Sequence, residues 1–306
     1  MDAGSITSLL AVAIAFAAPL IFVAMGELIS ERAGVINIQL EGMMLVGAFA
    51  GVWAAMASGS PAIGFVGGAA AGLMLALLHA VLCFVCKAEQ VVSGIVLNIF
   101  ALGLTTFALK PVFGPSAAVA APTLGNLSIP YLADLPVVGP ILFDQNAMVY
   151  VAFATVAAIW WFLTRTTAGL ALQASGEAPS AAVSMGINVP RVRWMAVLTC
   201  GAMAGIGGAQ LTLAGLGAFT QNVTAGRGFV ALAAVVFGRW MPAGTLLAIL
   251  LFTITEALQV RAQLVGIAVP YQFLVMAPYV VTVIAIAFFM KRGRAPASLG
   301  VATPDH

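Results

Sequence analysis

The chain has 306 residues, of which 62% are hydrophobic and 7% charged. Because about a quarter of the residues in a soluble domain are charged, this composition excludes a soluble globular protein and indicates an integral membrane protein. The formal net charge of +2 and the scattered basic residues also argue against nucleic-acid binding. Long apolar runs between short polar breaks favour a helical bundle over a β-barrel, whose strands would alternate apolar and polar residues.

A transmembrane helix needs about 20 predominantly apolar residues. Eight runs meet this requirement, near residues 6–29, 35–57, 61–86, 91–113, 146–164, 194–217, 243–260 and 268–290. A ninth run, 228–238, covers about half a bilayer, which indicates a broken or re-entrant helix. We therefore predict an all-α fold: a polytopic transmembrane helical bundle of about eight full spans plus one broken or re-entrant short helix, in a single domain over residues 1–306.

The distribution of basic residues predicts the orientation of the bundle. If the short run crosses the membrane once and the C-terminal "KRGR" is cytoplasmic, only Lys110, Arg227 and Arg261 of the 12 Lys and Arg residues fall outside. This asymmetry predicts an external N-terminus and a cytoplasmic C-terminus. A re-entrant short run would change the parity and the whole assignment with it.

Two polar stretches interrupt the spans. Residues 114–145 are rich in Pro and Gly and are expected to form an external loop that lies against the bundle. Residues 165–193 form the longest and most polar internal stretch. Within it, Pro179 suits the first position of a helix and Gly186 can close that helix. The helix is nearly uncharged, which suits a surface that binds in the groove of a cytoplasmic partner.

Glycines at four-residue spacing recur in several of the predicted spans. This spacing lets helices approach closely, and we favour packing within the chain over contact between subunits. The glycines concerned are Gly47, Gly51, Gly64, Gly68, Gly72, Gly201 and Gly205.

Motifs for catalysis and for nucleotide binding are absent from the sequence. It contains no GxxxxGK[ST] loop, no HExxH and no GxSxG. With His79 and His306 as the only histidines, a catalytic triad or a histidine metal site has almost nothing to be built from. We therefore expect no catalytic site, no metal and no cofactor in this chain.

Among the hydrogen-bonding side chains inside predicted spans, four are candidates for a substrate pathway: Asn37, Gln39, Glu41 and Asn98. An ionisable group at the bilayer centre costs roughly 2.5 to 3.5 kcal/mol on insertion scales, so its presence is a functional hypothesis. One interpretation places these side chains along a substrate pathway. The other makes them hydrogen-bond donors and acceptors that fix a break in the second span and a close helix contact. The sequence favours neither.

Four stretches resemble the inner-membrane permeases of bacterial ABC importers, a family that includes ribose, branched-chain amino acid and nucleoside permeases. They are "AGVINIQLEGMMLVGAF", "EQVVSGIVLNIFALGLTTF", "ASGEAPSAAVSMGINVPRVRW" and "GRGFVALAAVVFGRWMPAG". The third is similar to a "GENPxAAxxxGI" signature, which in that family forms the coupling helix that docks on the ATPase. The matching residues are Gly176, Glu177, Pro179, Ala181, Ala182, Gly186 and Ile187. Ala178 replaces a capping asparagine, a loss that typically costs about 1 kcal/mol of local helix stability.

The stretch "GVINIQLEGMM" resembles the nucleoside-type permeases, which are often described as simple-sugar permeases. The resemblance implies a permease subunit of an ATP-driven importer that takes up nucleosides by alternating access. One alternative is an ABC permease for another simple sugar or polar solute. A less favoured alternative is an ion-coupled secondary transporter, for which Glu41 is the single strong ionisable candidate.

The resemblance also implies the partners and the location. It implies a second, related permease that forms a heterodimer with this chain, and a cytoplasmic ATP-binding subunit that carries the ATP. It further implies an external substrate-binding lipoprotein or periplasmic protein, and no nucleic acid. The chain is then a multi-pass protein of the bacterial inner (plasma) membrane, surrounded by lipid.

Overall fold

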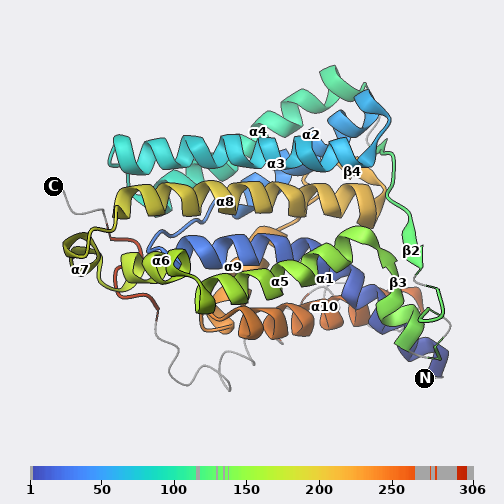
Figure 1. Cartoon of the computed structure of the whole chain (residues 1–306). Coiled ribbons are helices and arrows are strands. Elements are labelled where there is room, and N and C mark those ends of the chain that lie inside the picture. The colour runs from blue at the N-terminus through green and yellow to red at the C-terminus, as the bar shows by residue number, and fades with distance from the viewer. Residues whose placement is uncertain are drawn as a thin grey trace.

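The computed structural model describes residues 3–114, 118–128, 130–133, 135, 136, 138–265, 276, 280 and 295–301. These residues form a bundle of long helices whose axes run in roughly one direction (Figure 1). Within the described ranges, seven helices are long and apolar enough to cross a membrane. They confirm the first seven predicted spans, while the eighth, 268–290, lies outside the described residues.

Short connections join the first four spanning helices, and longer segments join the later ones. They are α1 (Ala3–Arg32), α2 (Leu40–Ser58), α3 (Pro61–Ala80), α4 (Gln90–Phe113), α5 (Ala147–Arg165), α8 (Val189–Gln210) and α10 (Pro242–Leu264). Two of them continue into π-helical turns, α3 into η1 (Val81–Val85) and α8 into η3 (Leu211–Leu216). The second span begins at Leu40, five residues later than the predicted start at 35, because residues 33–39 leave the helix.

The two ends of the bundle can be identified from contacts of α1. At its N-terminal end, the Arg261 guanidinium of α10 donates to the hydroxyl oxygen of Ser8 at 3.2 Å. At its C-terminal end, Arg32 Nε donates to the backbone oxygen of Trp240, just before α10, at 2.8 Å. Helices α1 and α10 are therefore antiparallel. We refer to these as the Ser8 end and the Arg32 end.

Short strands lie at the Ser8 end. Strand β1 (Ala118–Ala120) pairs antiparallel with β4 (Ala218–Thr220), and β2 (Asn126–Ser128) pairs with β3 (Asp144–Asn146). The turn η2 (Gly139–Phe143) precedes β3. Gln145 on β3 donates to the backbone oxygen of Ala11 on α1 at 3.2 Å. The described part of the 114–145 loop thus lies against the bundle, as predicted.

The short apolar run forms α9 (Arg227–Phe237). The chain before it leaves η3 at the Ser8 end, and the turn after it contains Trp240 at the Arg32 end. The run therefore joins opposite ends of the bundle, with an irregular stretch in one half and α9 in the other. This is the broken crossing of the two predicted alternatives, and it is the one that the predicted orientation assumes.

Glycines bring α2, α3 and α8 into direct backbone contact. A Cβ at Gly72 would overlap the carbonyl oxygen of Gly201, and a Cβ at Gly205 would overlap that of Gly68. A Cβ at Gly47 would lie 2.5 Å from the Cα of Gly205. Only glycine allows such an approach. The four-residue spacing seen in the sequence therefore serves packing within the chain, as predicted.

Candidate translocation and coupling sites

Residues 33–39 form a non-helical break between α1 and α2, buried inside the bundle. A helix that stops at membrane depth leaves backbone groups without partners, and burying them unpaired is costly. Side chains from two helices, α1 and α4, supply those partners. Ser30 donates to the Val35 oxygen at 3.0 Å, Gln90 accepts from Ile36 N at 2.9 Å, and Glu27 accepts from Asn37 N at 3.2 Å.

Asn98 on α4 supplies further hydrogen-bond partners for the backbone at the break. Its Oδ1 accepts from the backbone N–H of Gly42 at 2.7 Å, and its Nδ2 donates to the backbone oxygen of Ile38 at 2.9 Å. The side chain thus bridges the break and the first turn of α2. These hydrogen bonds are the ones that the structural interpretation of Asn98 requires, and a place along the substrate pathway stays a prediction.

Glu41 binds the N-terminus of α9. Its Oε1 accepts from the hydroxyl of Thr224 at 2.5 Å and from Gly226 N at 2.8 Å, while Oε2 accepts from Gly228 N at 2.7 Å. Backbone N–H groups at a helix N-terminus lack intrahelical partners and carry partial positive charge. Both carboxylate oxygens of Glu41 are therefore used to anchor the half-length helix α9.

Asn37 and Gln39 differ from this pattern. Both side chains are fully buried, and their amide nitrogens donate, Asn37 to Cys200 Sγ at 3.4 Å and Gln39 to the Leu75 oxygen at 3.3 Å. Their amide oxygens have no partner among the described residues. Buried polar atoms are nearly always paired, so these two acceptors need a further explanation. Asn37 and Gln39 are thus the two predicted pathway residues whose amide oxygens remain able to accept a hydrogen bond. A direct role in transport stays a prediction.

Sequence reasoning missed two buried glutamates on α1. Glu27 is fully buried and accepts from the thiol of Cys200 at 3.3 Å, and Glu31 accepts a hydrogen bond from the indole N–H of Trp240. Glu41 is therefore not the single ionisable group inside the bundle. The available signal was the spacing of the two glutamates, one helical turn apart at the end of an apolar run.

The predicted coupling segment lies at the Arg32 end, where α6 (Thr167–Glu177) leads into α7 (Pro179–Ser184) (Figure 1). Pro179 occupies the first turn of α7, and Gly186 with a φ of 82° follows its end, so the predicted helix is confirmed. Ala178 occupies the N-cap without a side-chain hydrogen bond.

Five of the seven matched signature residues are exposed or half-buried, and two are buried. Glu177, Ala181 and Gly186 are exposed, Pro179 and Ile187 are half-buried, and Ala182 is buried. Gly176 is buried against the break, where a Cβ would overlap the backbone oxygen of Arg32. Met185, just after α7, is 82% exposed. The segment therefore presents α7 outward while its base touches the break.

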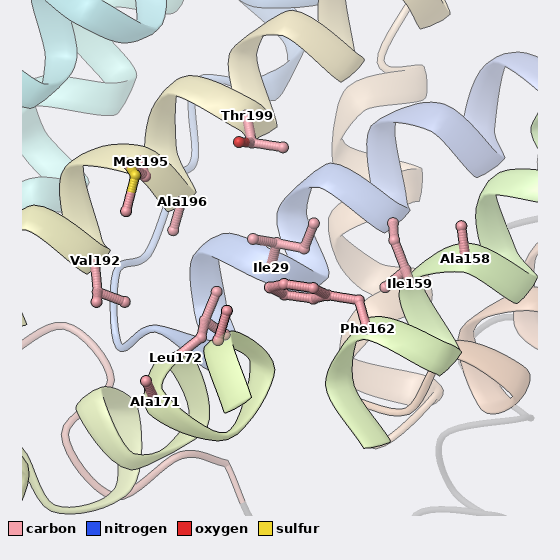
Figure 2. Close-up of a pocket in the computed structure, with 11 residues that line it drawn as sticks. Ile29, Ala158, Ile159, Phe162, Ala171, Leu172, Val192, Met195, Ala196 and Thr199 are labelled. Carbon is pink, nitrogen blue, oxygen red and sulfur yellow. The ribbon is translucent and has the colours of Figure 1, made fainter. Parts of the chain in front are cut away.

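A cavity of about 600 Å³ lies between α1, α5, α6 and α8 (Figure 2). Apolar side chains such as Ile29, Phe162 and Met195 line it, and Thr199 supplies a hydroxyl group. A polar solute needs several convergent hydrogen-bonding groups. This cavity therefore does not suit a polar substrate, and none of the four predicted pathway residues lines it.

The described residues thus form a polytopic helical bundle with a polar break inside it and an exposed short helix at one end. The family model for the branched-chain amino acid transport system permease component matches residues 9–291. The chain belongs to this family and is a multi-pass permease subunit of an ABC transporter, as its resemblance to those permeases implied.

Several curated proteins are similar over most of the chain. The nucleoside ABC transporter permease NupC of Lactococcus lactis is 38% identical over 94% of this chain and 93% of its own length. The guanosine ABC transporter permease NupQ of Bacillus subtilis is 37% identical over 98% of both chains. The putative glucose ABC transporter permease TsgC13 of Haloferax volcanii is 41% identical over 81% of this chain and 76% of its own.

The same three organisms each contain a second, less similar permease. NupB, NupP and TsgB13 are 25%, 26% and 29% identical to this chain over 78%, 71% and 73% of its length. The aligned regions span 68%, 64% and 62% of the lengths of NupB, NupP and TsgB13. No solved structure matches the chain significantly.

Proposed function

We propose that this chain imports nucleosides as one of two permease subunits of an ATP-driven transporter. The observation that carries the choice of substrate class is the contact between Glu41 and the N-terminus of α9. Half-helix N-termini near the bilayer midplane are where transporters commonly bind anionic groups of their substrates. Here a carboxylate of the protein already occupies that position.

This occupancy favours an uncharged solute over an amino acid, whose carboxylate would compete with Glu41. The names of the two relatives that match nearly the full chain, a nucleoside and a guanosine permease, support nucleosides. The putative glucose permease TsgC13 supports the alternative, a simple sugar, which is also uncharged. An ion-coupled secondary transporter is disfavoured because the family works as a component of a transport system.

The relatives fall into two groups by their sequence identity to this chain, and this division supports a heterodimer. Each of the three organisms has one permease at 37–41% identity to this chain and one at 25–29%. Two diverged permeases in one organism are expected when the two subunits of one transporter have specialised. We propose that the partner of this chain is a homologue of the less similar group, NupB, NupP and TsgB13, and that substrate passes between the two permease subunits.

The exposed helix α7 is the proposed docking site for the ATP-binding subunit, which would carry ATP. The Arg32 end then faces the cytoplasm, and the N-terminus is external. The strands β1 to β4 at the Ser8 end would face the external substrate-binding protein. This orientation agrees with the distribution of basic residues across the predicted loops.

Contacts within the chain suggest how docking drives transport. The base of the coupling segment, Gly176, touches the break at Gly34, and the other side of the break leads to Glu41, which binds α9. Movement of α7 can therefore be passed to the break and on to the half-helix. Alternating access requires that ATP binding favour one arrangement of these contacts over the other.

The test measures solute uptake and ATP hydrolysis in proteoliposomes. These contain this chain, the proposed partner permease, the ATP-binding subunit and the substrate-binding protein. Guanosine and adenosine are expected to stimulate ATP hydrolysis and to accumulate, and glucose and leucine are not. If glucose alone stimulates ATP hydrolysis, the substrate class is simple sugars and not nucleosides. Stimulation by leucine would overturn the argument from Glu41, and failure of any ATP-binding subunit to associate would overturn the proposal.

The proposed docking site has a matched control. Met185→Glu places a charge beside α7, and Tyr131→Glu does the same at a position that is 89% exposed on the loop at the other end. Met185→Glu is expected to abolish co-purification of the ATP-binding subunit, whereas Tyr131→Glu leaves it intact. Equal co-purification of both variants would exclude α7 as the docking site.

A further inference from the structure

Arg193, the fifth residue of α8, is fully buried. Its guanidinium donates to four acceptors: Ala33 O at 3.2 Å, Val301 O at 2.9 Å, Ser298 Oγ at 3.3 Å and Ser175 O at 3.5 Å. Three of the four are backbone carbonyl oxygens. A buried charge is tolerated only when its donors are satisfied, so this arrangement specifies the position of each acceptor.

These acceptors come from three segments that are far apart in the sequence. Ala33 follows the last residue of α1, and Ser175 lies in the last turn of α6. The other two acceptors lie in residues 295–301, which we name the C-terminal strap. Carbonyl groups at helix C-termini lack intrahelical partners and carry partial negative charge. Arg193 therefore caps α1 and α6 together and holds the strap against both.

The C-terminal strap crosses the contact between the coupling segment and the break. Ser298 donates from its backbone N–H to Gly176 O at 2.9 Å and from its hydroxyl to the same oxygen at 2.5 Å. Gly300 N donates to Gly34 O at 3.1 Å. The strap is thus hydrogen bonded on one side to the base of the coupling segment and on the other to the break.

Close packing leaves little freedom at this junction. A Cβ at Gly34 would lie 2.9 Å from the Arg193 guanidinium and 3.3 Å from the Cα of Gly176. The φ of Gly34 is 91°, which L side chains rarely adopt. Separating any one segment would leave part of the guanidinium buried without acceptors. The three segments are therefore expected to move as one unit.

We propose that Arg193 and the C-terminal strap lock the coupling segment to the break, so that displacement of α7 is transmitted into the bundle. The inference rests on the proposed function and deepens it by naming the element that transmits the movement. In this proposal Arg193 is a positioning residue, which acts through the segments that it holds together. Arginine suits this role because its planar fork of five donors reaches several acceptors at once, whereas lysine provides a single point charge.

Two perturbations test the lock, each with a matched control. Arg193→Met removes the guanidinium, and Arg191→Met changes an exposed arginine on the same turn of α8. Deletion of residues 296–306 removes most of the strap, and deletion of 302–306 leaves it in place. Arg193→Lys is included as a variant that keeps the charge and loses the fork, in case Arg193→Met does not fold.

The first readout needs only the permease chain. Hydrogen exchange is measured at the backbone amides of residues 33–36 and 174–178. Deletion of 296–306 and Arg193→Met or Arg193→Lys are expected to accelerate exchange in both segments together, while the two controls match the unmodified chain. Acceleration in one segment alone, or in neither, would overturn the lock.

The second readout uses the assembled transporter and the solute that stimulates it. The lock variants are expected to retain the ATP-binding subunit and basal ATP hydrolysis but to transport about tenfold less solute per ATP, a loss typical of coupling between sites. Unchanged transport per ATP, or loss of the ATP-binding subunit itself, would refute the inference. If the unmodified chain binds no ATP-binding subunit, the proposed function fails, and hydrogen exchange still reports on the lock.

Discussion

Asn98 on α4 and Gly42 on α2 are joined by a hydrogen bond of 2.7 Å from the backbone N–H of Gly42 to Oδ1. The same side chain donates to Ile38 O on the other side of the first turn. The helices are also close here, since a Cβ at Gly42 would lie 3.0 Å from the Cβ of Ala101. One amide therefore ties α4 to both sides of the point where α2 begins.

Asn98→Ala is expected to destabilise the folded chain, because it leaves the Gly42 N–H and the Ile38 carbonyl group without partners. Each orphaned group costs about 1–3 kcal/mol. Asn98→Asp keeps the acceptor and loses the donor, so its stability is expected to lie between those of the unmodified chain and Asn98→Ala. The measurement is thermal unfolding in detergent. Gly103→Ala on the same helix is the control, because a Cβ there meets open space. An Asn98→Ala chain as stable as the control would contradict the structural role.

Glu41→Gln is expected to weaken the attachment of α9. A glutamine amide can accept through one oxygen only, so one of the three donors at the α9 N-terminus would face an N–H group. A lost buried hydrogen bond of this kind costs about 1–3 kcal/mol. Solute uptake and unfolding temperature are both expected to fall. Glu89→Gln, at an exposed glutamate without a side-chain cap bond, is the control. Normal uptake by Glu41→Gln would show that the anchor is dispensable.

Ala178→Asn is expected to stabilise α7 by about 1 kcal/mol, because the new side chain can accept from an unpaired N–H in the first turn. Slower hydrogen exchange of the α7 amides is the measurement. Ser184→Asn introduces the same side chain at the last residue of the helix, where it cannot cap the N-terminus. Identical exchange in the two variants would show that the missing cap does not limit the stability of α7.

Gly205→Ala is expected to prevent normal packing, because its Cβ would overlap the backbone oxygen of Gly68, which no side-chain rotation can relieve. Overpacking of this kind costs about 1–3 kcal/mol and sometimes more. The yield of monodisperse protein in size-exclusion chromatography should fall sharply for Gly205→Ala and remain normal for Gly103→Ala. Equal yields would mean that α3 and α8 can separate without loss of the fold.

Local patterns in the sequence were sufficient to predict several features. The positions of the described spans follow from the length of apolar runs, because bilayer thickness fixes how many residues must be apolar. The helix from Pro179 to Gly186 follows from its end signals, and the glycine contacts follow from their spacing. Each of these depends on residues close together in the chain.

Features that depend on distant partners could not be predicted in the same way. The donors around Glu41 come from residues more than 180 positions away, so composition could not decide between pathway and anchor. Arg193 was counted only as a basic residue that sets orientation, although its partners lie at 33, 175, 298 and 301. The late start of α2 likewise follows from tertiary hydrogen bonds that replace those of a helix.

The glycine contacts among α2, α3 and α8 have a mechanical consequence. Helices that meet through layers of long side chains can slide or rotate, because rotamer changes absorb the displacement. Where backbones touch, nothing deformable lies between them, and the packed group resists relative motion. These three helices are therefore expected to keep their positions relative to one another, so that any motion during transport carries them together as one body.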